Sequence, residues 1–184
     1  NVDDEDGVTL PATLVACGTA NVSVNASAVS KLDAFVDFNR NGSFADAGEK
    51  IFNNQALVAG ANALSFSVPC NATPTTLTFA RFRISTAGNL ASTGVAADGE
   101  VEDYTVGIRG LDFGDAPAVY PTLLAGNGAR HIVVPGAPLL GATIDTEADG
   151  QPTAGANGHD LTTSDDEDGV TFTSPLIRGQ NASV

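Results

Sequence analysis

The chain has 184 residues, enough for one domain or for one domain with a long connector. Apolar residues make up 42% of it, which can supply a hydrophobic core, while Gly (20 residues) and Pro (9 residues) indicate frequent turns. Its 8 basic and 22 acidic residues give a net charge of −14, which argues against nucleic acids and anionic membranes as partners. No apolar run in the sequence is long enough to span a membrane.

Short segments with the two-residue periodicity of β-strands fill the first 110 residues. We expect strands at 8–15, 20–28, 32–38, 51–58, 63–68, 77–85 and 101–108. Pro11 lies within the first of these segments, which indicates an edge position or a bulge. Short strands between turn residues, without clear helical periodicity, are typical of a sandwich. We therefore predict an all-β fold, an antiparallel β-sandwich that is Ig-like or jelly-roll-like.

The composition changes after Gly110. Residues 111–162 are rich in Gly, Ala, Pro and Asp and contain few apolar runs. A structureless loop of this length is unusual inside a compact domain. We therefore predict three parts: a β-sandwich module at 1–110, a partly ordered Gly/Pro/Asp-rich connector at 111–162, and the first strand or strands of a second module at 163–184.

The prediction of a second module rests on a repeated phrase. Asp-Asp-Glu-Asp-Gly-Val-Thr occurs at residues 3–9 and again at 165–171, an offset of 162 residues (165 − 3). Such a repeat indicates a tandem array, whose stacked copies form a spacer, a stalk or a polymer. Met is absent even at residue 1, and both ends lie within the repeat, so we interpret the chain as part of a longer precursor. The match continues more weakly at Leu176, Ile177, Ala182 and Val184, the counterparts of Leu14, Val15, Ala20 and Val22.

The two cysteines, Cys17 and Cys70, match no zinc-binding spacing. In an acidic chain of extracellular character, rich in Asn and Thr, we expect them to form one disulfide. It would close a loop of 53 residues (70 − 17). Two buried free thiols are the alternative. Gly179 stands where the repeat would place a second Cys17, so the disulfide would be specific to this copy.

The most specific literal motif is Gly-Glu-Val-Glu-Asp-Tyr at residues 99–104. Ala-Phe-Val-Asp-Phe-Asn at 34–39 and Ala-Arg-Phe-Arg-Ile-Ser at 80–85 precede it, and Asp-Phe-Gly-Asp-Ala-Pro follows at 112–117. In this order, the phrases resemble the GEVED domain and its common connector, found in large bacterial secreted and cell-surface proteins. The resemblance implies a β-sandwich in an extracellular or cell-surface protein, and it says little about a ligand.

The first candidate metal site is the segment 37–42, Asp-Phe-Asn-Arg-Asn-Gly. Oxygen side chains at positions 1, 3 and 5, followed by Gly at position 6, match the opening of an EF-hand loop. Position 12 is Gly48 in place of a carboxylate, so two later acidic residues would have to complete the shell in a different geometry. A hairpin turn without metal is the alternative. The predicted calcium ligands are Asp37, Asn39, Asn41, Asp46 and Glu49.

A second loop repeats this spacing with three charged ligands, Asp145, Glu147 and Asp149. Here a solvated loop is the alternative to a calcium site. The third candidate is the repeated acidic phrase, whose carboxylates would repel one another unless a cation neutralised them; the alternative is a disordered acidic linker. Its predicted ligands are Asp3, Asp4, Asp6, Asp165, Asp166 and Asp168, with Glu100, Glu102 and Asp103 of the last strand as co-ligands.

Arg81 and Arg83 share one face of the strand expected at 77–85, where they could pair with some of these carboxylates. Catalytic motifs such as a Gly-x-Ser-x-Gly elbow or His-Glu-x-x-His are absent from the sequence. The two histidines, His131 and His159, both lie in the expected connector. We therefore predict that the chain is not an enzyme.

Taken together, these patterns favour a structural repeat module of an extracellular bacterial stalk, fibre or filament. Calcium would make the module rigid, and strand pairing would join it head to tail to copies of itself, since the apolar residues of 163–184 need a partner sheet. The alternative is an adhesin module that binds a surface carbohydrate or a partner protein. Trp is absent and only two Tyr are present, which argues against stacking on a sugar.

Overall fold

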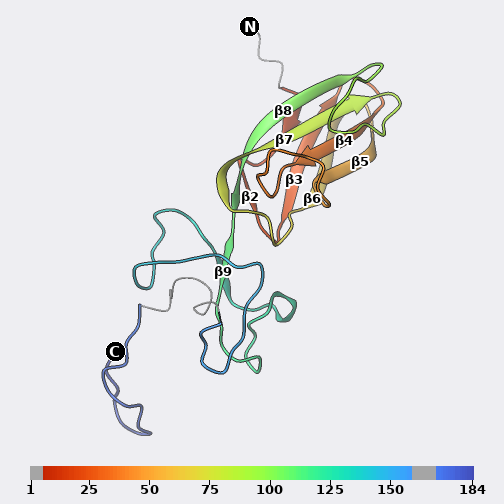
Figure 1. Cartoon of the computed structure of the whole chain (residues 1–184). Coiled ribbons are helices and arrows are strands. Elements are labelled where there is room, and N and C mark those ends of the chain that lie inside the picture. Colours follow the sequence, from red (N-terminus) through yellow and green to blue (C-terminus); the bar gives the residue numbers. More distant parts are fainter. Residues whose placement is uncertain (1–5, 159–168) are drawn as a thin grey trace. The chain divides into compact units, whose positions relative to one another are not determined.

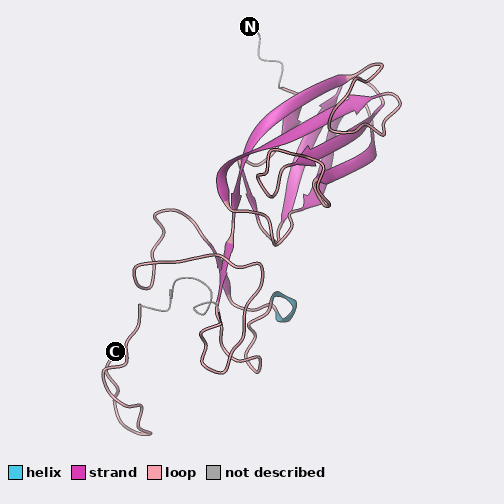
Figure 2. Cartoon of the chain, in the orientation of Figure 1, coloured by secondary structure: helices cyan, strands magenta, loops and turns pink. Residues whose placement is uncertain are grey.

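Figure 1 shows the computed structural model of the chain, which describes residues 6–158 and 169–184. The chain divides into two compact units, Asn1–Gly110 and Leu111–Val184, and each is described by itself. The described residues of the first unit form strands joined by loops, with no helix among them (Figure 2). These strands are β1 (Val8–Thr9), β2 (Thr13–Val15), β3 (Thr19–Ala26), β4 (Ser30–Val36), β5 (Lys50–Leu57), β6 (Gly60–Ser67), β7 (Thr75–Ser85) and β8 (Glu100–Arg109).

The strands of the first unit form two sheets, with the orders β1-β3-β6 and β2-β8-β7-β4-β5. Alternation places one face of each sheet in a shared core; along β3, for example, Ala20, Val22, Val24 and Ala26 are buried and the residues between them are exposed. The predicted all-β sandwich is confirmed. Its three-plus-five strand order is that of an Ig-like sandwich and differs from a jelly roll, which is built from two Greek keys.

The first expected strand, at 8–15, is in fact two strands in different sheets. Val8 of β1 pairs with Val24, whereas Leu14 of β2 pairs with Ile108 of the other sheet. Pro11 lies between the two strands, where its missing N–H prevents a continuous ladder. The β2–β8 pair is parallel, so the prediction of a purely antiparallel sandwich is wrong for this pair. The other six expected strands are present as β3–β8, with shifted ends.

The predicted disulfide between Cys17 and Cys70 is confirmed. Cys17 lies in the turn from β2 to β3, and Cys70 lies between β6 and β7. Both segments carry the chain from one sheet to the other, and the backbone N–H of Val68 donates to the carbonyl oxygen of Gly18 beside them (2.9 Å). The disulfide therefore connects the two places where the chain crosses the sandwich at this end.

The second unit contains a short antiparallel pair, β9 (Leu111–Phe113) with β10 (Arg130–Ile132), and the 3-10 turn η1 (Leu124–Gly126). Its loops are held by side chains that bind backbone groups. Asp149 Oδ1 accepts from the N–H of Leu124 (2.6 Å), and Asp115 Oδ1 accepts from the N–H of Gln151 (3.2 Å). Within the described residues, no helix has the length and apolarity needed to cross a membrane.

Residues 169–184 form no strand, which differs from the expectation of strands at 163–184; residues 159–168 lie outside the described part. In the first unit, the equivalent positions are strands because β6, β8 and the rest of the sandwich supply hydrogen-bonding partners. The described residues of the second unit offer no comparable sheet. The apolar side chains of this segment are consequently each more than half exposed: Val170, Phe172, Leu176, Ile177 and Val184.

Candidate metal centre

The β4–β5 loop, residues 37–49, contains the first predicted calcium site. Its two end residues, Asp37 and Glu49, are both buried, at 4% and 2% exposure. The loop turns back on Asp37, whose Oδ1 accepts from the N–H of Asn41 (3.2 Å) and whose Oδ2 accepts from the N–H of Gly42 (2.9 Å). Gly42 has a φ of 81°, a conformation that glycine adopts without strain. The sequence 37–42 thus forms the sharp turn that its spacing predicts.

The asparagine side chains of the β4–β5 loop take part in local hydrogen bonds. Asn39 Oδ1 accepts from the N–H of Asn41 (3.0 Å), and Asn41 Oδ1 accepts from the N–H of Ser43 (2.9 Å). Asn41 Nδ2 donates to Asp46 Oδ2 (2.8 Å), which brings the acidic residue to the same turn. Asn41 therefore forms hydrogen bonds with three other predicted ligands, Asp37, Asn39 and Asp46.

Glu49 is the residue whose surroundings best fit a cation. Its Oε2 accepts from the N–H of Asp46 (3.2 Å), while its Oε1 is buried and has no hydrogen-bond donor. Burial raises the pKa of Glu49 above its usual value; the backbone N–H groups of Asp46 and Asn39 oppose this rise, and the negative charges of Asp37 and Asp46 add to it. A buried carboxylate oxygen without a donor is costly, and a bound cation would remove that cost.

No group of three or more His, Cys, Asp or Glu side chains in the described residues is gathered closely enough to hold a metal by itself. Calcium differs from zinc in that it accepts neutral amide and carbonyl oxygens beside carboxylates. The β4–β5 loop fits calcium on this basis, because Asn39 and Asn41 would supply neutral oxygens and Asp37, Asp46 and Glu49 would supply the charge.

The structure brings two of the three ligands of the second candidate site together, since Asp145 and Glu147 share a side-chain hydrogen bond, but Asp149 is engaged elsewhere. Asp149 binds backbone N–H groups near η1, whereas Glu147 Oε2 accepts from the N–H of Phe113 in β9 (2.9 Å). The pKa of Glu147 is raised to about 8, and burial is the largest cause. Its hydrogen bond with Asp145 and the negative charges of Asp145 and Asp112 also raise it. Asp112 is a neighbour that the spacing of residues 145–149 could not indicate.

Only part of the third candidate site lies within the described residues. Asp3, Asp4, Asp165, Asp166 and Asp168 lie outside the described residues. Glu102 is buried and accepts the backbone N–H groups of Asp6 (3.2 Å) and Gly7 (3.0 Å) through Oε1.

The predicted co-ligands on β8 do not form one set. Asp103 binds Arg81 through two hydrogen bonds, from Nε (2.7 Å) and Nη2 (2.6 Å). Glu102 and Asp103 are consecutive strand residues and face opposite sides of the sheet, so they cannot share one cation. Glu100, the first residue of β8, is exposed. The expected pairing of Arg81 with a carboxylate is confirmed.

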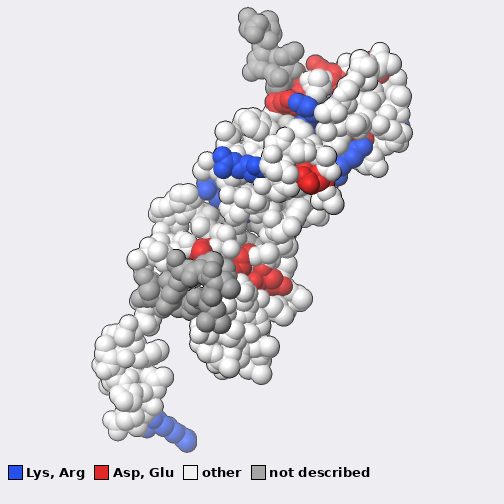
Figure 3. Space-filling view, viewed as in Figure 1, with Lys and Arg blue, Asp and Glu red and all other residues white. Residues whose placement is uncertain are grey.

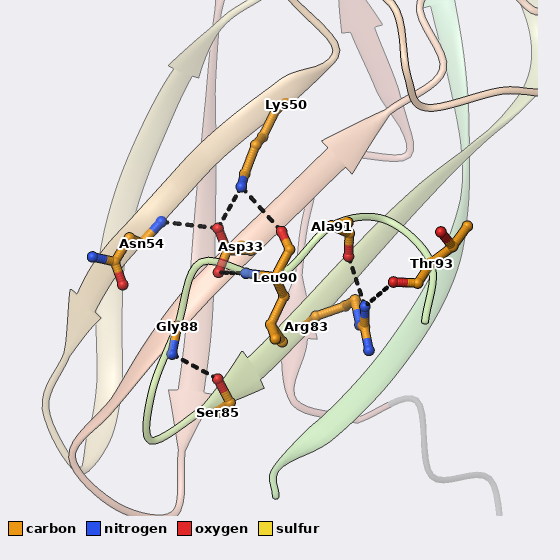
Figure 4. Close-up of polar contacts among 9 residues, drawn as sticks. All are labelled: Asp33, Lys50, Asn54, Arg83, Ser85, Gly88, Leu90, Ala91 and Thr93. Atoms are coloured by element: carbon orange, nitrogen blue, oxygen red, sulfur yellow. Dashed lines mark hydrogen bonds and ion pairs between the residues drawn. The ribbon is translucent and has the colours of Figure 1, made fainter. Parts of the chain in front are cut away.

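Sequence reasoning missed a buried polar centre on the outer face of the larger sheet (Figure 4). Asp33 is fully buried, and its Oδ1 accepts from Lys50 Nζ (2.7 Å) and from the N–H of Asn54 (3.0 Å). Its Oδ2 accepts from the N–H of Leu90 (2.9 Å). Burial alone would raise the pKa of Asp33, but Lys50 and the N–H groups of Leu90 and Asn54 hold it below its usual value.

Two arginines complete this centre, which we call the polar cage: Asp33, Lys50, Arg81 and Arg83. Arg83 donates to the carbonyl oxygens of Ala91 (2.6 Å), Thr93 (3.0 Å) and Gly94 (2.7 Å). Arg83 therefore holds the β7–β8 loop, residues 86–99, instead of pairing with a carboxylate as expected. Figure 3 shows that charged side chains lie in small, separate groups on the visible face.

The polar cage and the β4–β5 loop are in contact through aromatic rings. Phe44 of the loop packs against Phe35 of β4, with ring centroids 6.2 Å apart. The Arg81 guanidinium lies over the Phe44 ring at 5.5 Å, and Lys50 Nζ lies over the Phe35 ring at 5.4 Å. These cation–π contacts connect the β4–β5 loop to the polar cage.

The family model of the GEVED domain matches residues 31–107. This chain contains a GEVED domain. The match runs from β4 to β8, so the β4–β5 loop, the polar cage and Glu102 all lie within the GEVED domain, while β1–β3 complete its sandwich from outside the matched part. The searches of curated proteins and of solved structures matched nothing to this chain.

Proposed function

We propose that this GEVED module is a structural repeat unit of an extracellular bacterial stalk, fibre or filament, stiffened by calcium and joined to neighbouring copies by strand pairing. The observation that supports the calcium role best is the buried Glu49 Oε1, which has no donor and lies beside a turn that gathers further oxygen side chains. Calcium held between Asp37, Glu49 and their neighbours would fix the connection between β4 and β5.

The repeated phrase and the exposed segment 169–184 support the pairing between copies. The disulfide supports an oxidising compartment, as expected for a secreted or cell-surface protein. The function is structural on this proposal, and no residue of the described part is assigned a catalytic role.

An adhesin role is the second candidate. A surface depression of about 500 Å³ beside β7 and β8 is lined in part by Arg81, Ser92 and Asp103, and Phe79 on β7 is 50% exposed. The polar groups of this depression could bind a carbohydrate or a partner protein, and the exposed ring of Phe79 lies on the same strand as Arg81. Binding of the isolated chain to a glycan array would favour this role over the structural one.

Calcium should raise the melting temperature of the wild-type chain relative to chelator. A cation that binds only the folded state stabilises it by about 2.7 kcal/mol at a free concentration one hundred times its Kd. Glu49→Gln should abolish this gain. In chelator the variant should be at least as stable as the wild type, because it removes a buried charge that Asp37 and Asp46 repel. Thermal unfolding followed by circular dichroism measures both effects.

Asp98→Asn is the matched control, because Asp98 is an exposed carboxylate in the β7–β8 loop. This variant should keep the calcium response of the wild type. Equal melting temperatures of the wild type in calcium and in chelator would contradict the calcium role.

A further inference from the structure

The buried Glu102 and its neighbour Tyr104 bind three consecutive backbone N–H groups at the start of the module. Glu102 Oε1 accepts from Asp6 (3.2 Å) and Gly7 (3.0 Å), and Tyr104 Oη accepts from Val8 (3.1 Å). Tyr104 Oη in turn donates to Glu102 Oε2 (2.9 Å), so the two side chains act as one unit. The pKa of Tyr104 is raised to about 12, chiefly by burial. The N–H of Val8 lowers this pKa and Glu102 raises it, and the hydroxyl therefore keeps its proton.

The shape of this unit selects glycine at the middle position. A Cβ on Gly7 would lie 3.1 Å from both Glu102 oxygens, closer than most Cβ contacts in proteins. The carbonyl oxygen of Gly7 accepts from the N–H of Asn25 (2.8 Å), and Val8, which is 8% exposed, enters the core. The unit therefore binds the backbone of Xaa-Gly-Val, disfavours a Cβ at the glycine, and is followed by an apolar side chain that enters the core.

The same three residues recur as Asp168-Gly169-Val170, within the phrase that repeats seven residues literally. Here Val170 is 54% exposed, and the described residues that follow form no strand. The sequence thus contains two copies of the recognised phrase, while the described residues contain one Glu102–Tyr104 unit, already filled by the first copy.

We propose that Glu102 and Tyr104 of the GEVED signature form a receptor for the Asp-Gly-Val phrase, and that the phrase at 168–170 fills this receptor in a second copy of the module. The segment 169–184 would then follow the path of β1, β2 and β3 in that copy, and its exposed apolar residues would become core residues. This inference rests on the proposed pairing between copies and names the site that performs it.

The test uses the Gly7→Val substitution in the full chain. This substitution should displace the first Asp-Gly-Val phrase from Glu102 and Tyr104 and so leave the receptor empty. Hydrogen exchange measured by mass spectrometry should then slow about tenfold or more at the amides of Gly169 and Val170, because the first gains a charge-assisted hydrogen bond to Glu102 and the second a hydrogen bond to the Tyr104 hydroxyl. Adding Glu102→Leu to Gly7→Val should restore fast exchange. Gly114→Val is the matched control, because a Cβ on Gly114 meets nothing within 4 Å, and it should leave exchange unchanged.

Protein concentration distinguishes a second copy from the same chain. Protection that grows with concentration, together with a dimer or larger species in analytical ultracentrifugation, supports the proposal. Protection that is independent of concentration in a monomer overturns the assignment to a second copy. Fast exchange at Gly169 and Val170 in folded Gly7→Val overturns the receptor itself.

A synthetic peptide of residues 165–184 keeps the test decisive if Gly7→Val does not fold. Excess peptide should displace Asp6, Gly7 and Val8 of the wild-type chain and so speed hydrogen exchange at their amides. The peptide with Gly169→Val should have no such effect. If both peptides act equally, or neither acts, the receptor is overturned. Melting in calcium and in chelator tests the proposed function separately. If calcium does not change the melting temperature but the changes in hydrogen exchange are observed, the calcium role is overturned and the receptor is retained.

Discussion

Replacing Cys17 and Cys70 by serine is expected to lower the free energy of unfolding of the sandwich by about 4 kcal/mol. The disulfide closes a loop of 53 residues, and opening it returns that much chain entropy to the unfolded state. The loss is a large part of the stability of a small domain, which is about 5–15 kcal/mol. Urea unfolding of the wild-type and Cys17→Ser/Cys70→Ser chains, followed by circular dichroism, measures the difference.

The wild type in reductant should approach the double-serine variant, and reductant should have no further effect on the variant. This control separates the disulfide from any effect of the serine side chains. Unfolding midpoints that agree between the oxidised wild type and the double-serine variant would show that the disulfide does not stabilise the sandwich.

Asp33→Ala is expected to cost about 3 kcal/mol or more, because it removes the acceptor of two part-buried backbone N–H groups, those of Asn54 and Leu90, and the ion-pair partner of the partly exposed Lys50. The loss should first affect the β7–β8 loop, which the polar cage holds. Lys50→Met alone and the double variant Asp33→Ala/Lys50→Met complete a double-mutant cycle. If the polar cage acts as a unit, the double variant should lose less than the sum of the two single variants. Strictly additive losses would contradict the cage.

The same residue predicts a loss of stability in acid. The pKa of Asp33 is lower in the folded protein than its usual value of 3.8, because its hydrogen bonds outweigh its burial. Its contribution is therefore complete above that value and is lost as the pH falls through the lower, folded pKa. The wild type should lose stability below about pH 4, and Asp33→Asn should lose less over the same range.

The fold could be predicted largely because strand periodicity is a local property. The alternation of Val22 and Val24 with polar residues was sufficient to place β3. The disulfide between Cys17 and Cys70 could be predicted from the composition and the expected extracellular compartment alone. The change of sheet at Pro11 was not predictable, because a proline indicates only that a ladder is interrupted and does not say which strand comes next. The parallel β2–β8 pair depends on that choice.

The candidate sites were predictable only where the ligands are close in sequence. The turn at Asp37 forms as its spacing predicts. Asp33 alternates with the core residues of β4 and so lies on the outer face of the sheet, where Lys50 of β5 and Leu90 of the β7–β8 loop contact it. Glu102 and Asp103 were grouped by adjacency, whereas strand geometry separates them. The burial of Asp33 was decided by contacts between distant segments, whereas the separation of Glu102 from Asp103 follows from local strand geometry.

The parallel pairing of β2 with β8 has a mechanical consequence. Thr13, Leu14 and Val15 lie beside Gly107, Ile108 and Arg109, so the first and last parts of the sandwich run side by side in the same direction. Tension that enters ahead of β2 and leaves after β8 would slide these strands past each other lengthwise. Their backbone hydrogen bonds would then share the load and break together, unlike a hairpin that unzips bond by bond. If they did break, the Cys17–Cys70 bond would still keep the enclosed loop from extending.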